Sequence, residues 1–99
     1  MDDRIKTECR TPTPGKKSTF IAAWKFEIIR NAILKVLETH KEGLLFKDLA
    51  DEVGAVLDDA TINKIGSMLW YSTTVKLEME VREEIERIPG VKPQKIRLK

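Results

Sequence analysis

The fold of this 99-residue chain is decided by residues 70–99, which read WYSTTVKLEMEVREEIERIPGVKPQKIRLK. Residues 75–82 alternate apolar and polar side chains, as a half-buried strand does. The same residues continue a stripe at helical spacings of three and four, formed by Ile62, Ile65, Leu69, Ser72, Val75 and Met79. Because Lys, Leu, Glu and Met are good helix formers, the composition favours a long third helix, with a break near Gly66-Ser67. Glu78 and Arg82 also have the spacing and order of a helical ion pair.

The residues after this helix predict a β-hairpin. Residues 84–88 lead into Pro89-Gly90, a dipeptide that suits the centre of a type II turn. Residues 94–99 then alternate polar and apolar side chains, which is typical of a half-buried strand. We therefore expect residues 84–99 to form two antiparallel strands joined by a turn.

Two more helices are predicted upstream. The first, at about residues 19–40, follows from the spacing of Phe26, Ile29, Ile33, Val36 and Leu37. The second, at about residues 47–57, follows from Leu49, Val53 and Val56. Between them, Leu44-Leu45-Phe46 predicts a brief strand or a buried linker.

Residues 1–17 have a different composition from the rest of the chain. They contain Pro12, Pro14 and Gly15 but few large apolar side chains, so their burial would not offset the entropy lost on ordering. We expect a flexible basic arm over residues 1–17 and a folded domain over residues 18–99.

Helix, short strand, helix, helix and hairpin is the order of a winged helix-turn-helix, an α-rich α+β fold with three helices and a C-terminal hairpin, the wing. Two segments resemble that superfamily. The stretch LLFKDLADEVG, residues 44–54, is similar to its second helix, and VREEIERIPG, residues 81–90, is similar to the end of its third helix. Many winged helices have a glycine near position 83, where this chain has Glu83.

A second resemblance covers about residues 12–99. It rests on Trp70-Tyr71, residues 73–77, residues 85–87, Pro89-Gly90 and Pro93-Gln94. These residues are similar to the C-terminal half of a family of small microbial proteins, a domain of unknown function. The resemblance implies a winged-helix-like fold and implies no activity.

Length and composition exclude several classes of protein. A chain of 11.4 kDa has room for one core. Its longest near-continuous apolar run, residues 20–24, is far shorter than the ~20 residues of a membrane-spanning helix. The single cysteine, Cys9, excludes an intramolecular disulfide and a multi-cysteine zinc site. Because the first ten residues lack the apolar segment of a secretory signal, we expect a cytoplasmic protein without membrane contact.

No catalytic, cofactor or metal site is expected. The one histidine, His40, is expected in the last turn of the first helix, where the helix dipole favours it. Cys9 has no histidine or second cysteine beside it to activate the thiol. The acidic pairs at residues 58–59 and 83–84 suit helix caps and solvated faces better than acid–base catalysis. We therefore expect that the protein is not an enzyme.

The winged-helix interpretation predicts double-stranded DNA as a partner, in a role such as transcriptional regulation, and the distribution of charge places that partner at the basic ends of the chain. Residues 89–99 carry four Lys or Arg and no Asp or Glu, although the net charge is only +2. A winged helix sets the start of its third helix into the major groove and lays the wing along the backbone. The expected contacts are Ser72, Thr73, Thr74 and Lys76 on the helix, Lys92, Lys95, Arg97 and Lys99 on the wing, and Lys16 and Lys17 on the arm. The glutamates later in the helix would repel phosphates, so only its start can read bases.

The alternative is a protein–protein interaction module with the same fold. Trp70 and Tyr71 are adjacent, so on a helix they point about 100° apart and do not easily share one core. An exposed aromatic side chain beside Leu77 and Val81 would suit a protein partner or a homodimer.

Overall fold

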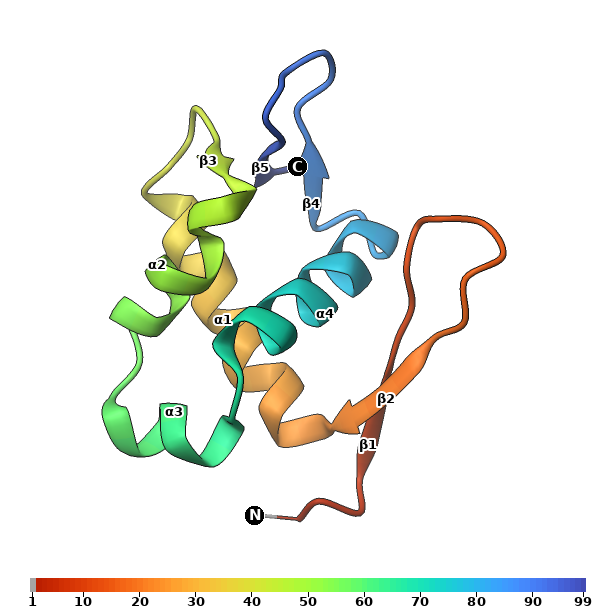
Figure 1. Ribbon diagram of the computed structural model, residues 1–99, viewed down its shortest axis with the longest axis vertical. Helices are drawn as coiled ribbons and strands as arrows, with labels where there is room; N and C mark the ends of the chain where they lie inside the picture. The colour runs from red at the N-terminus through yellow and green to blue at the C-terminus, as the bar shows by residue number, and fades with distance from the viewer. Residues whose placement is uncertain (1) are drawn as a thin grey trace.

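The computed structural model describes residues 2–99, which form four α-helices and two small antiparallel sheets (Figure 1). The α-rich α+β architecture expected from the sequence is confirmed. At the N-terminal end, β1 (Lys6–Cys9) pairs with β2 (Thr19–Ala22), and α1 (Ala23–Glu38) follows β2 directly. The hairpin that β1 and β2 form stands to one side of the helices in Figure 1.

This hairpin corrects two sequence predictions. Residues 6–9, expected in a flexible arm, form β1, and residues 19–22, expected in the first helix, form β2. Side chains alternate along the strands: Cys9 and Ile21 lie in the core, each 4% exposed, whereas Glu8 and Phe20 form an exposed cross-strand pair. Strands of four residues are too short to show this alternation clearly in the sequence.

Three helices follow α1 along the chain. The elements are β3 (Leu44–Leu45), a single 3₁₀ turn η1 (Phe46–Asp48), α2 (Leu49–Ala55), α3 (Asp59–Ile65) and α4 (Met68–Val81). Asp58 caps α3 by accepting a hydrogen bond from the Thr61 N–H at 2.7 Å. Ser67 caps α4 by accepting one from the Trp70 N–H at 3.1 Å. Between these helices Gly66 has φ 109°, so the predicted break near Gly66-Ser67 is confirmed, as is the helix over most of residues 75–82.

The predicted C-terminal hairpin is confirmed as β4 (Ile85–Arg87) and β5 (Lys95–Leu98). The central strand, β5, pairs antiparallel with β4 on one side and with β3 on the other. Ile96 therefore lies opposite both Leu44 and Arg87. This sheet joins the middle of the chain to its C-terminal part.

The core lies among α1, α2, α4 and the C-terminal sheet (Figure 1). Its most deeply buried apolar side chains are Phe26, Ile29, Ile33, Leu37, Leu49, Val53, Ile65, Val75, Met79, Ile85 and Ile96. On α1 and α4 these residues recur at spacings of three and four, as the sequence predicts. Across residues 2–99, no helix has both the length and the apolar character required to cross a membrane.

Glu83 occupies a backbone conformation that glycine adopts more easily. The end of α4 is closed by hydrogen bonds from the Glu83 N–H to the Glu80 carbonyl, 3.1 Å, and from the Glu84 N–H to the Met79 carbonyl, 3.0 Å. This ending places Glu83 at φ 62°, where a side chain costs about 1–2 kcal/mol. The chain thus makes a glycine-type turn with a glutamate.

Replacing Glu83 by glycine is expected to raise the free energy of unfolding by about 0.5–1 kcal/mol. The steric cost at positive φ disappears, and the greater freedom of glycine in the unfolded chain offsets part of the gain. The ion pair to Lys99, 2.7 Å, is too exposed to contribute much. Urea denaturation measures the difference. Glu83→Gln is the matched control, because it removes the same charge and keeps the strain; equal stability of the two variants would contradict the prediction.

Candidate interaction face

The inner face of α4 joins the core through Ser72, Val75 and Met79, each at most 1% exposed. Ser72 was predicted to contact DNA, and its burial shows that this prediction is wrong. Its hydroxyl oxygen makes no hydrogen bond within residues 2–99. Ser72, Val75 and Met79 of the predicted apolar stripe are therefore buried, whereas Leu69, which was assigned to the same stripe, is exposed.

All three charged residues of α4 lie inside the protein, in ion pairs. Lys76, predicted to face DNA, has a side chain that is only 1% exposed, so that prediction is also wrong. Its Nζ lies 2.6 Å from Glu80 Oε1, donates to Gln94 Oε1 at 2.6 Å, and lies 4.5 Å from the centre of the Phe46 ring. Burial lowers the pKa of Lys76, and the Glu80 carboxylate opposes that shift. Lys76 thus ties α4 to the β4–β5 connection and to η1.

The third charge, Glu78, ties α4 to the N-terminal hairpin. Its carboxylate is 1% exposed and accepts hydrogen bonds from the Arg10 backbone N–H and Nη2, both at 2.7 Å, and from Arg82 Nε at 2.8 Å. The pair of Glu78 with Arg82 was predicted from its spacing and is confirmed. Burial raises the pKa of Glu78, but the hydrogen bonds from the two arginines outweigh it and hold the pKa at about 2.

With its charges turned inward, α4 presents an uncharged surface on the opposite side. We call this surface the outer face of α4; it consists of Leu69, Trp70, Thr73, Thr74, Leu77 and Val81. Leu69 is 69% exposed and Trp70 is 48% exposed, and the other four are partly exposed. These positions recur at one, three and four residues, so they cover one continuous side of the helix. In a chain that is 34% charged, an exposed helix face without a charge is unusual.

The two adjacent aromatic residues, Trp70 and Tyr71, take different positions. Tyr71 packs against the core, and its hydroxyl accepts a hydrogen bond from Lys25 Nζ at 3.2 Å. Lys25 also lies 4.9 Å from the centre of the Tyr71 ring and donates to the Ile65 carbonyl at 3.0 Å. Trp70 packs its ring edgewise against Tyr71, with 4.8 Å between ring centres, and stays half exposed. Tyr71 therefore supports Trp70 from behind.

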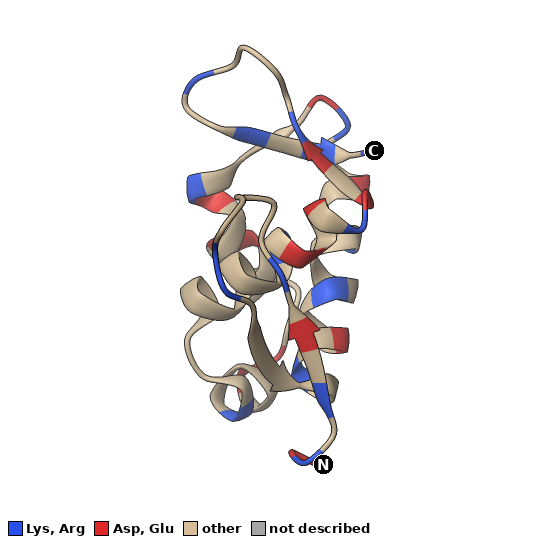
Figure 2. Cartoon of the chain, turned by 90° about the vertical axis from the view of Figure 1, so that its right-hand side faces the viewer, with Lys and Arg blue, Asp and Glu red and all other residues tan. Residues whose placement is uncertain are grey.

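The wing cations predicted to bind DNA fall into two groups. Arg97 Nε donates to Glu86 at 2.8 Å and Lys99 Nζ donates to Glu83 at 2.7 Å, so both charges are paired. Figure 2 shows basic and acidic segments side by side on this hairpin. Lys92 is exposed and Lys95 partly exposed, and neither makes an ion pair within the part of the chain that is described.

The remaining predicted contacts are Lys16 and Lys17 on the β1–β2 loop and Thr73 and Thr74 on α4. Both lysines are exposed and are unpaired among residues 2–99. Both threonines are partly exposed and belong to the outer face of α4. The predicted DNA contacts that reach the surface thus lie on the β1–β2 loop, the C-terminal hairpin and the outer face of α4.

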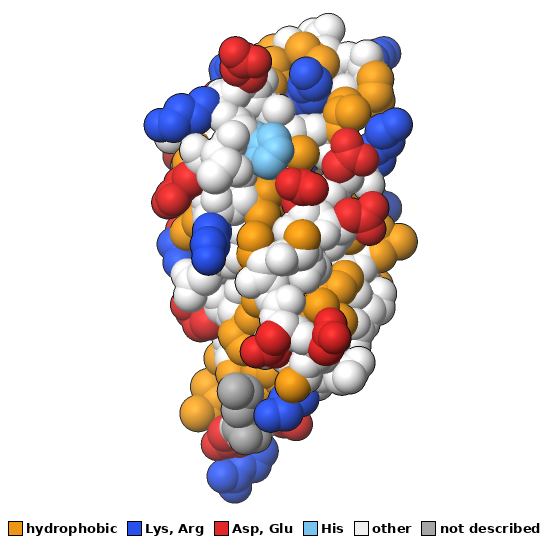
Figure 3. Space-filling model, turned by 90° about the vertical axis from the view of Figure 1, so that its left-hand side faces the viewer, with side chains coloured by type: hydrophobic (Ala, Val, Ile, Leu, Met, Phe, Trp, Pro, Cys, Tyr) orange, Lys and Arg blue, Asp and Glu red, His pale blue; other side chains and the backbone are white. Residues whose placement is uncertain are grey.

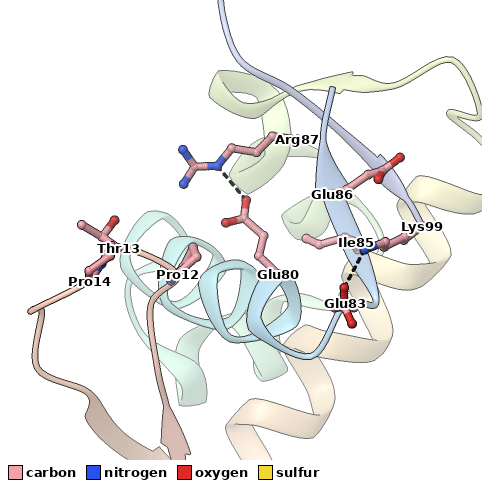
Figure 4. A pocket seen from close by; sticks show the side chains of 9 residues that line it. All are labelled: Pro12, Thr13, Pro14, Glu80, Glu83, Ile85, Glu86, Arg87 and Lys99. Atoms are coloured by element: carbon pink, nitrogen blue, oxygen red, sulfur yellow. Dashed lines mark hydrogen bonds and ion pairs between the residues drawn. The ribbon is translucent and has the colours of Figure 1, made fainter. Parts of the chain in front are cut away.

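A cavity of about 490 Å³ lies between the β1–β2 loop, the end of α4 and β4 (Figure 4). Pro12 and Pro14 line it from the loop and Ile85 from β4. Each of its charged side chains has a partner: Glu80 with Arg87 at 3.0 Å, Glu83 with Lys99 at 2.7 Å, and Glu86 with Arg97 at 2.8 Å. The cavity therefore offers an ionic ligand no free charge.

The side of the molecule that carries His40 has a different character from the outer face of α4. His40 follows α1, its Nδ1 lies 2.9 Å from the Val36 carbonyl oxygen, and its Nε2 lies 3.8 Å from Glu52. Figure 3 shows charged side chains interspersed among the hydrophobic ones on this side. Within residues 2–99, no three His, Cys, Asp or Glu side chains gather as metal ligands.

A comparison with protein families gives one match, to a family of unknown function (DUF6958) over residues 6–96. The chain belongs to this family. The match supports the part of the sequence analysis that placed residues 12–99 in a domain of unknown function, and it extends the family's segment back to β1. No curated protein and no solved structure gives a significant match.

Proposed function

We propose that this DUF6958 protein is a protein–protein interaction module that docks through the outer face of α4. The observation that carries the proposal is the direction of the helix's charges: Lys76, Glu78 and Glu80 point inward into ion pairs, and uncharged side chains point outward. Burying charges while exposing Trp70 and Leu69 opposes the hydrophobic effect unless the exposed face is covered in use. A tryptophan that is supported from behind is a typical interface anchor.

The proposal includes a winged-helix fold for residues 23–99, with α4 as its third helix. The order of α1, β3, α2, α4 and the β4–β5 hairpin, with the short helix α3 between α2 and α4, supports this assignment, and so does the pairing of β5 with both β3 and β4. In that fold α4 holds the position from which a DNA-binding member would enter the major groove. Its outer face has no cation to neutralise phosphates, which favours a protein partner over DNA.

A photo-reactive amino acid at position 69 tests the docking surface. In cells that make the full chain, we expect irradiation to give a discrete covalent adduct, because Leu69 is the most exposed large side chain of the outer face. The same probe at position 20 is the matched control, since Phe20 is 62% exposed but lies on the N-terminal hairpin. Absence of a discrete adduct from position 69, or equal yields from both positions, would contradict the proposal.

DNA binding through the loops is the second candidate, and four lysines favour it. Lys16, Lys17, Lys92 and Lys95 are free of ion pairs among residues 2–99 and lie on the loop and the wing. In a regulator that binds in this way, they would hold phosphates and supply affinity without base specificity. Lys92 and Lys95 are the two that a wing would place along the backbone.

On this second candidate, replacing Lys92 and Lys95 together by alanine is expected to reduce the slope of log affinity against log salt by about 2. A titration with a mixed-sequence duplex at low and physiological salt measures this slope. Arg97→Ala is the matched control: Glu86 already neutralises Arg97, so the slope should change by well under 1. No binding at low salt, or an unchanged slope in the double variant, would remove DNA as a partner of the wing.

A further inference from the structure

We propose that the outer face of α4 binds the same face of a second copy of this chain, about a two-fold axis. The inference rests on the proposed function, because it uses the same surface, and it names the occupant. Homo-oligomers with two-fold symmetry place one patch against an identical patch, so the patch must be complementary to itself.

The charge of the outer face meets that requirement. When identical surfaces meet about a two-fold axis, a charge close to the axis faces the same charge of the other copy, which opposes association. The outer face of α4 has none, because Lys76 and Glu80 pair with each other inside the protein. A highly charged partner, by contrast, would find no opposite charge on it.

The order of large and small side chains along the outer face of α4 also makes the face complementary to itself. Trp70 and Leu77 lie seven residues apart, about 10 Å along the helix, with Thr73 and Thr74 between them. In an antiparallel pair with its axis at Thr73 and Thr74, Trp70 of each copy packs on Leu77 of the other. The threonines at the axis are small enough for the two helices to approach closely. Between Trp70 and Leu77 the pattern large, small, large is therefore the same in both directions.

The other exposed aromatic residue does not offer such a surface. Phe20 is 62% exposed, but Lys6 and Glu8 share its side of the hairpin, and both are exposed. Charges therefore interrupt that patch. Phe20 gives a control position with similar exposure and a different expected outcome.

Sedimentation equilibrium of the full chain over a range of concentrations tests the inference. We expect the mass to rise from 11.4 kDa to twice that value with increasing concentration. Trp70→Glu should weaken the association at least ~100-fold, because each copy loses its anchor and places a charge in the contact. Phe20→Glu introduces the same charge and should leave the association within about twofold of the parent. A parent protein that stays at 11.4 kDa, or equal losses in both variants, would overturn the inference.

A cysteine at position 74 tests the position of the axis. Two Thr74→Cys copies in the proposed pairing lie near the ~4.4–6.8 Å between Cα atoms that a disulfide requires, so mild oxidation should give a covalent dimer. The native Cys9 is 4% exposed and should stay unreacted. Val91→Cys, at a wing position that is 37% exposed, is the matched control and should oxidise to dimer at least ~10-fold more slowly. Equal rates for the two variants would overturn the pairing.

The results separate failure of this inference from failure of the proposed function. A monomeric parent with a discrete adduct from position 69 to a different protein would overturn the second copy and keep docking through α4. A monomeric parent with no adduct would overturn both. An adduct of twice the chain mass that is absent in Trp70→Glu supports both.

Discussion

Replacing Glu78 by glutamine is expected to lower the free energy of unfolding by about 3 kcal/mol. The carboxylate is almost fully buried and accepts four hydrogen bonds, from Arg10 N, Nε and Nη2 and from Arg82 Nε, at 2.7–3.0 Å. An amide has one accepting oxygen, and its NH₂ group would face guanidinium donors. The magnitude follows from the pKa of Glu78, which falls from 4.5 to about 2, at ~1.4 kcal/mol for each pH unit. Urea denaturation at neutral pH measures the loss.

The pH dependence of stability gives the same prediction a second readout. Because the pKa of Glu78 is lower in the folded state, its contribution is complete above about pH 4.5 and is lost as the pH falls towards 2. The parent should therefore lose stability across this range. Glu78→Gln should lack that part of the loss, so the two curves should converge near pH 2.

A third readout is the thiol of Cys9, which lies on the strand next to Arg10. In the parent, Cys9 is buried and its pKa is raised to about 11, chiefly by that burial, so it should react slowly with a thiol reagent. Loss of the Glu78 contacts releases β1 from α4 and should speed the reaction. The matched control is Glu83→Gln, whose carboxylate is 73% exposed and should contribute under about 1 kcal/mol. Equal stability of the Glu78 and Glu83 variants would contradict the prediction.

The helices could be predicted because their signal is local and repeats over several turns. For residues 75–82 the stripe through Val75 and Met79 indicated a helix and the alternation a strand; the composition favoured helix, and the structure confirms helix over most of these residues. The N-terminal hairpin could not be found in this way. β1 and β2 have four residues each, and the burial of Cys9 depends on tertiary contacts, among them those of β1 with a helix nearly seventy residues later.

The candidate site shows a conflict that was already present in the sequence. Ser72 was assigned both to the apolar stripe, which faces inward, and to the DNA contacts, which face outward. Helix geometry allows one of these, and the structure supports the stripe. The inward position of Lys76 had a weaker signal: Glu80 four residues later is a suitable partner, but the contacts with Gln94 and Phe46 depend on the tertiary fold.

These corrections change which function the chain favours. Once Lys76 is inside the protein, the helix that would read DNA has no outward cation, and two of the four wing cations are neutralised by neighbouring glutamates. Trp70, by contrast, which the alternative interpretation named as a partner-binding residue, is half exposed. Glu78 and Lys76 point inward and hold α4 to the N-terminal hairpin and to the β4–β5 connection. The other side of the helix is therefore left without a charge.

Replacing Lys76 by methionine is expected to lower the free energy of unfolding by about 2–3 kcal/mol. Methionine fills a similar volume but, among residues 2–99, leaves the Glu80 carboxylate, 7% exposed, with Arg87 as its one partner and removes the Lys76 donor from Gln94 Oε1. If the loss in Lys76→Met comes from the buried Glu80 carboxylate that has lost a partner, adding Glu80→Leu removes that charge. The double variant should then lose at least ~1 kcal/mol less stability than the sum of the losses in the two single variants. Urea denaturation of the four proteins measures this coupling.

Because the ammonium of Lys76 does not reach solvent, folded Lys76→Met should bind a mixed-sequence duplex as the parent does. If Lys76→Met kept its full stability but bound DNA more weakly than the parent, Lys76 would belong to the DNA-binding surface and the prediction would be wrong.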